Sequence, residues 1–112
     1  MTTKKIAKVK VGPHDYELLW DADACTGASV NGALLADVGK LLIDPRLSLT
    51  QSQDTLLHET LHAIWKQVLV NEYPDEDANS PGEKIIALLT PRILGLLKDN
   101  HRLVSFLVAK DV

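Results

Sequence analysis

The chain has 112 residues, of which 46% are hydrophobic and 24% charged, with a net charge of −3 and a single cysteine. This length and composition predict one small domain with one core. The acidic balance argues against nucleic-acid binding, and one cysteine excludes an internal disulfide and suits a reducing compartment. The first five residues lead into strand-like alternation, so we expect no signal peptide, and no apolar run approaches the roughly 18 residues of a membrane span. We therefore expect a soluble cytoplasmic protein with no nucleic-acid or membrane partner.

The start of the chain has the pattern of a β-hairpin. Residues 6–11 alternate between apolar and polar types, residues 12–15 (Gly-Pro-His-Asp) are turn formers, and residues 16–20 are again strand-like. We predict two antiparallel strands joined by a loop of about four residues. Residues 21–32 are small and polar, which predicts mostly loop.

Two apolar segments, residues 33–38 and 40–44, predict one or two further short strands. Pro45 ends them, because proline has no backbone N–H for a sheet and restricts the residue before it. We therefore expect a small antiparallel sheet of three to four strands, with helices after it, which is an α+β arrangement. The predicted single domain (1–112) comprises a β-rich part (1–45) and a helical part (48–110).

Three helices are predicted in the second part. The first covers about residues 50–70, with Ser48 or Thr50 as its N-cap and a glutamine three residues later completing a capping box. An acidic connector then leads into a helix from residue 81 or 82 to about 98, which Pro91 should kink by removing a backbone hydrogen bond. A last helix is expected over about residues 101–109.

Residues 58–62 read His-Glu-Thr-Leu-His, an H-E-x-x-H motif. On a helix, His58 and His62 lie one turn apart, with Cβ atoms about 5–6 Å apart, so both imidazoles can reach one Zn²⁺. Glu59 is then placed to act on a water at the metal. The histidines lie beside an apolar stripe that we expect to be buried, where they would be costly without a partner such as a metal. That stripe consists of Leu57, Leu61, Ile64 and Val68.

A catalytic zinc site normally has three protein ligands and one open position. Glu83 is the expected third ligand, because the 21 residues after His62 allow the chain to turn back and project this carboxylate inward. One alternative is that Glu83 only interacts favourably with the helix dipole. In that case His101 or a connector carboxylate could be the third ligand. Cys25 could also add a fourth ligand and make the zinc structural. The connector carboxylates are Glu72, Asp75, Glu76 and Asp77.

This ligand set predicts hydrolytic chemistry. Zinc would activate a water at neutral pH, and Glu59 would accept its proton and pass it to the leaving amine. A further donor usually stabilises the developing oxyanion, and the sequence does not choose among four candidates: His14, Tyr73, Arg92 and His101. If the strand over residues 40–44 forms a sheet edge beside the metal, an extended peptide could add to it; an ordinary paired strand is the alternative.

Residues 56–65 (Leu-Leu-His-Glu-Thr-Leu-His-Ala-Ile-Trp), with residues 42–45 before them, resemble the zincin metallopeptidases in their smallest form. They are similar to small phage and prophage proteins with a stand-alone H-E-x-x-H domain, and to the ImmA/IrrE-type metallopeptidases, which cleave repressor proteins. The resemblance covers residues 40–105. It implies a catalytic base and three zinc ligands, which are Glu59 for the base and His58, His62 and Glu83 for the ligands. The chain has no room for the second subdomain of larger relatives, so a protein partner could complete the cleft.

The expected function is therefore zinc-dependent hydrolysis of peptide bonds in an intracellular protein substrate, by a phage or prophage protein. One alternative is a non-catalytic zinc-containing module that binds another protein. Another is a metal-free α+β protein in which the motif is fortuitous. Zinc content separates the last from the other two, and a Glu59→Gln variant separates the first two.

Overall fold

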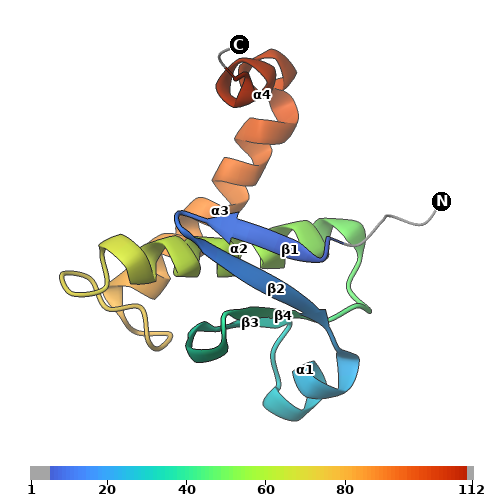
Figure 1. The fold of residues 1–112 in the computed structure, drawn as a ribbon, viewed down its shortest axis with the longest axis vertical. Helices are drawn as coiled ribbons and strands as arrows, with labels where there is room; N and C mark the ends of the chain where they lie inside the picture. The colour runs from blue at the N-terminus through green and yellow to red at the C-terminus, as the bar shows by residue number, and fades with distance from the viewer. Residues whose placement is uncertain (1–5, 111–112) are drawn as a thin grey trace.

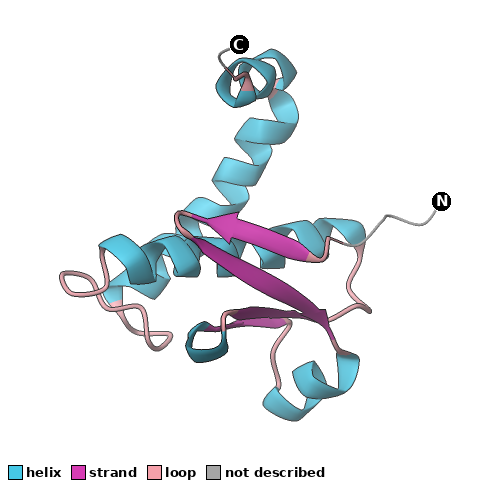
Figure 2. Ribbon diagram, viewed as in Figure 1, coloured by secondary structure: helices cyan, strands magenta, loops and turns pink. Residues whose placement is uncertain are grey.

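The computed structural model describes residues 6–110 and consists of a four-stranded sheet followed mainly by helices (Figures 1 and 2). The predicted α+β class is therefore confirmed. The first five residues, on which the signal-peptide expectation partly rests, lie outside the described part. The elements in chain order are β1 (Lys8–Val11), β2 (His14–Trp20), α1 (Ala22–Ala28), β3 (Gly32–Leu35), the short 3-10 helix η1 (Ala36–Val38), β4 (Lys40–Ile43), α2 (Leu49–Val68), α3 (Pro81–Asp99) and α4 (His101–Val108).

The predicted hairpin is present, but its turn is tighter than expected. Val11 pairs with His14, so only Gly12 and Pro13 connect β1 to β2. Gly12 has a φ of 58°, a left-handed conformation that suits the first position of a two-residue turn, and the fixed negative φ of proline suits the second. The expected four-residue loop was wrong because His14 and Asp15 belong to the strand.

The sheet has the order β1-β2-β4-β3. Two of its three pairings are antiparallel, as predicted, whereas β2 and β4 run parallel. The parallel pairing arises because α1 and β3 carry the chain away from β2 and back before β4 begins. As a result β4 lies inside the sheet and β3 lies at its edge. The prediction that the strand over residues 40–44 could be an edge was therefore wrong.

Residues 21–32, predicted as mostly loop, contain the helix α1. Asp21 caps it by accepting a hydrogen bond from the backbone N–H of Ala24 at 3.0 Å, and Cys25 anchors it as a fully buried side chain. Ser29 ends it in the left-handed conformation, with a φ of 58°. The prediction of mostly loop was wrong, because a segment of small and polar residues can form a short capped helix as well as a loop.

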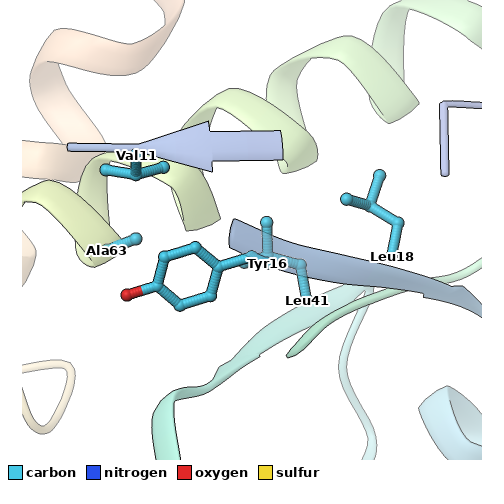
Figure 3. Close-up of a cluster of buried hydrophobic side chains, with 5 residues drawn as sticks. All are labelled: Val11, Tyr16, Leu18, Leu41 and Ala63. Carbon is cyan, nitrogen blue, oxygen red and sulfur yellow. The ribbon is translucent and has the colours of Figure 1, made fainter. Parts of the chain in front are cut away.

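The helix α2 begins at the predicted cap and packs on the sheet. Ser48 accepts a hydrogen bond from the backbone N–H of Gln51 at 3.2 Å, and the side chain of Gln51 accepts one from the Ser48 N–H at 3.1 Å, which completes the capping box. Figure 3 shows the core side chains between α2 and the sheet. This core cluster consists of Val11, Tyr16, Leu18, Leu41 and Ala63.

The buried face of α2 differs from the predicted stripe. Ile64 and Val68 are exposed, whereas His62 and Ala63 are buried. Compared with the predicted orientation, α2 is rotated about its axis. Ala63 packs into the core, and Gln67 donates a hydrogen bond to the backbone carbonyl of Val11 at 2.9 Å. His62 is buried and His58 is partly buried, so neither histidine lies on the exposed side of the helix.

The helix α3 begins beside α2 and runs unbroken through Pro91. In Figure 1 its C-terminal half extends away from the sheet, and α4 lies at that far end. The two helices end within one residue of the predicted bounds. Among the described residues, none of the helices combines the length and the apolar composition that a membrane crossing requires.

Candidate metal centre

The three predicted ligands come together between α2 and the start of α3. The two imidazole rings lie one turn apart on α2, with centroids separated by 5.0 Å, and the carboxylate of Glu83 bridges them. Oε1 of Glu83 lies 3.0 Å from Nε2 of His58, and Oε2 contacts Nε2 of His62. Within residues 6–110, this is the one group of three His, Cys, Asp or Glu side chains whose ligand atoms lie so close together.

The donor set fits a divalent metal such as zinc. Two imidazole nitrogens and one carboxylate oxygen are the ligands of many catalytic zinc sites. In this chain the three candidate ligand atoms all lie within 4.8 Å of one another, whereas ligands of one tetrahedral zinc are about 3.3 Å apart for zinc–ligand distances near 2.0–2.1 Å. Small side-chain rotations therefore suffice to place all three around one ion.

A second capping motif holds Glu83 in place. Ser80 is the N-cap of α3 and accepts a hydrogen bond from the Glu83 backbone N–H, while its own hydroxyl donates to the carbonyl of Asp77 at 2.7 Å. The backbone N–H of Gly82 donates to the carbonyl of Pro74 at 2.9 Å. These bonds tie the end of the connector to the first turn of α3, so Glu83 projects from a braced position rather than from a free helix end.

Asp75, one of the four connector carboxylates named as alternative ligands, lies at the site in a role that the sequence did not predict. Of residues 71–79 it alone is buried, and its Oδ2 lies 2.6 Å from Nδ1 of His62. Its other oxygen, Oδ1, lies 3.3 Å from Nζ of Lys66 in an ion pair. Burial raises the pKa of Asp75, but the contacts with His62 and Lys66 outweigh burial and keep this pKa below its ordinary value. Its position 13 residues after His62, inside an acidic run, carried no signal that distinguished it from its exposed neighbours.

Glu59, the predicted base, lies beside the ligands but is not one of them. Its carboxylate is partly buried, and this burial raises its pKa above the ordinary value. The neighbouring imidazoles and the backbone of Leu34 oppose that shift, while the negative charge of Glu83 adds to it. Glu59 is therefore a partly buried carboxylate next to both histidines, in the position that the motif gives to a proton acceptor.

A cleft of about 400 Å³ opens over these groups. One wall is α2, a second is the connector with the start of α3, and the third is the edge strand β3. The site therefore has an accessible side that is bordered by backbone. The lining residues that carry charge or an imidazole are His58, Glu59, His62, Lys66, Asp75, Glu76, Asp77 and Glu83.

The two remaining ligand candidates, Cys25 and His101, are not among the described residues that line the cleft. Cys25 is buried in α1, where its thiol faces the carbonyl of Asn31, and burial raises its pKa. His101 is exposed at the start of α4 and is not part of the ligand cluster. None of the four candidate oxyanion donors, which are His14, Tyr73, Arg92 and His101, is among the described residues that line the cleft.

Three comparisons with known proteins give no relative. No family model, no curated protein and no solved structure matches this chain. The function proposed below therefore depends on the arrangement of the chain's own residues.

Proposed function

We propose that this chain is a zinc-dependent metallopeptidase that hydrolyses peptide bonds of an intracellular protein substrate, and that it is of phage or prophage origin. The observation that supports this most is the convergence of His58, His62 and Glu83, with Glu59 beside them, in one cleft. The motif alone specifies the two histidines and the base. Folding adds the third ligand from a different helix, which an accidental motif does not require.

The chemistry is divided between the three ligands and the base. His58, His62 and Glu83 would hold the ion, which when bound lowers the pKa of a coordinated water and polarises the scissile carbonyl. Glu59 would accept the proton of the attacking water and return it to the nitrogen of the leaving amine. Because Glu59 comes directly after His58 on a rigid helix, its distance from the reacting atoms is set by the helix rather than by a mobile loop.

The substrate peptide would lie along β3. Within residues 6–110 this strand pairs only with β4, and Gly32, Ala33 and Leu34 line the cleft. An extended peptide that pairs with the free edge of β3 would pass over the metal ligands, with its backbone held by sheet hydrogen bonds. The strand over residues 40–44, for which the sequence suggested this role, lies inside the sheet and cannot take it.

The alternative is a non-catalytic zinc-containing module that binds a protein. One observation favours this binding module over a peptidase. The four candidate donors for an oxyanion are not among the described residues that line the cleft. In the peptidase proposal, a partner protein or the substrate itself completes the cleft and supplies this donor.

A Glu59→Gln variant distinguishes the two. The amide has nearly the same shape but cannot accept the proton, so we expect zinc content to stay at one equivalent while cleavage falls by about 10²–10⁴-fold. Cleavage is measured by mass spectrometry after incubation of the zinc-loaded protein with a proteome-derived peptide library. The matched control is Glu72→Gln, which removes an exposed connector carboxylate outside the cleft lining and should cleave like the wild type. Equal cleavage by Glu59→Gln and the wild type would contradict the peptidase proposal.

A further inference from the structure

The two histidines of the candidate metal centre have different surroundings. Both Nε2 atoms face the carboxylate of Glu83. His62 also has a partner on its other nitrogen, because its Nδ1 lies 2.6 Å from Oδ2 of Asp75. For His58, no partner of Nδ1 occurs among the described residues. His62 is therefore held at both ends of its ring, and His58 at one.

The contact between His62 and Asp75 has the geometry of a buried, charge-assisted hydrogen bond. The side chain of Asp75 is fully shielded from solvent, and that of His62 is nearly so. Asp75 can accept a hydrogen bond only if Nδ1 carries the hydrogen, so in a neutral imidazole that binds a metal through Nε2 the lone pair would lie on Nε2. The lone pair then points toward Glu83 and His58, where the metal would lie.

Asp75 does not act as a metal ligand in this arrangement. The two nitrogens of an imidazole ring point away from each other, so a carboxylate on Nδ1 lies on the far side of the ring from an ion on Nε2. Lys66 fixes the carboxylate further, since its ammonium group lies 3.3 Å from Oδ1. Lys66 comes one helical turn after His62 on α2, so both partners of Asp75 come from the same helix face.

Burying a carboxylate in a connector loop is costly unless it is paired. The residues on either side of Asp75 in this loop are exposed, whereas Asp75 itself is buried. The bond from Nε1 of Trp65 to the carbonyl of Tyr73 and the bond from Gly82 to the carbonyl of Pro74 hold the chain on both sides of Asp75. The fold thus directs one acidic side chain inward, onto His62.

We propose that Asp75 is a positioning residue of the metal centre: it holds His62 through Nδ1 so that Nε2 is presented to the ion, and Lys66 holds Asp75. This inference rests on the proposed function, because it concerns the same ligands. It adds a residue that takes no part in the H-E-x-x-H motif and touches neither the metal nor the reacting atoms.

The test compares zinc affinities, measured by competition with a chromogenic chelator at one pH, for the wild type, Asp75→Asn and Glu76→Gln. Loss of such a partner typically weakens metal binding by about 10–100-fold, and we expect this for Asp75→Asn. Glu76→Gln removes a neighbouring, exposed carboxylate at the same cleft and should stay within about twofold of the wild type. Equal affinities of Asp75→Asn and the wild type, or equal losses in the two variants, would overturn the inference.

A second measurement needs no variant and so does not depend on how well Asp75→Asn folds. In ¹⁵N NMR spectra of the zinc-loaded wild type, His62 should coordinate through Nε2 and show a slowly exchanging proton on Nδ1, whereas the Nδ1 proton of His58 should exchange faster. Coordination of His62 through Nδ1 would overturn the inference while leaving zinc binding intact. A wild type that binds no zinc would overturn the proposed function, and the inference with it.

Discussion

The two ends of α3 differ in burial: its buried residues all lie in its first ten positions, although apolar side chains are exposed in both halves. At its N-terminal end Gly82, Ile86 and Thr90 are buried, Ser80 caps the helix, and Glu83 reaches the histidines of α2. At its C-terminal end the apolar side chains are largely exposed, and α4 continues this trend. The exposed set includes Leu96, Leu97, Leu103, Phe106, Leu107 and Val108. Only the N-terminal end of α3 contributes buried residues, although the sequence of both ends is strongly apolar.

The comparison shows that hydrophobicity alone does not identify which part of a helix supports a site. The N-terminal end of α3 is braced by a cap, by the connector and by α2, so it can hold a carboxylate in a defined position. The C-terminal end has no comparable constraint within the described residues. We therefore expect substitutions of similar size to have very different effects at the two ends.

The largest effect on stability is expected for Ile86→Ala. Ile86 is 1% exposed, so truncation leaves a cavity and should lower the free energy of unfolding by about 2–5 kcal/mol. Phe106→Ala is the matched truncation at the other end of the helical pair, where the side chain is 79% exposed, and should change stability by less than about 0.5 kcal/mol. Urea denaturation in the presence of a chelator measures both without a contribution from metal. Similar losses in the two variants would show that α4 is packed as tightly as the N-terminal end of α3.

A smaller effect is expected for Gly82→Ala. An added Cβ would lie 2.6 Å from Nε1 of Trp65 and 2.8 Å from the carbonyl oxygen of Pro74, so the connector must shift, at a cost of about 1–3 kcal/mol. The matched control on the same helix is Gly95→Ala, which meets no atom within 4 Å and should stabilise the protein by about 0.5–1 kcal/mol. Thermal denaturation measured by circular dichroism shows whether each variant melts at a lower or a higher temperature than the wild type. A higher melting temperature for Gly82→Ala would contradict the packing described for the N-terminal end of α3.

The parts of this molecule that could be predicted from sequence are those specified by local patterns. The capping box at Ser48, the helical spacing around His58 and His62, and the end of the sheet at Pro45 depend on residues a few positions apart. The position of Glu83 beside the two histidines could be predicted as well, because a helix that returns antiparallel to α2 places its first turn near the motif. The structure brings all three predicted ligands together.

The remaining features depend on contacts between distant segments. β2 pairs in parallel with β4, which makes β3 the edge strand. This pairing results from how the chain crosses between the two strands, and no local sequence pattern predicts it. The same holds for the rotation of α2 that exposes Ile64, and for Asp75, whose partner His62 is 13 residues away. A connector carboxylate cannot be recognised as buried until the loop that carries it is placed.

The most direct test of the central claim is zinc-edge X-ray absorption spectroscopy of the protein carrying one equivalent of zinc. The proposed site predicts two imidazole nitrogens at about 2.0–2.1 Å and carboxylate or water oxygens at about 2.0–2.2 Å, with no sulfur. A sulfur ligand at about 2.3 Å would implicate Cys25 and contradict the site, as would a protein that retains full folding but binds no stoichiometric zinc.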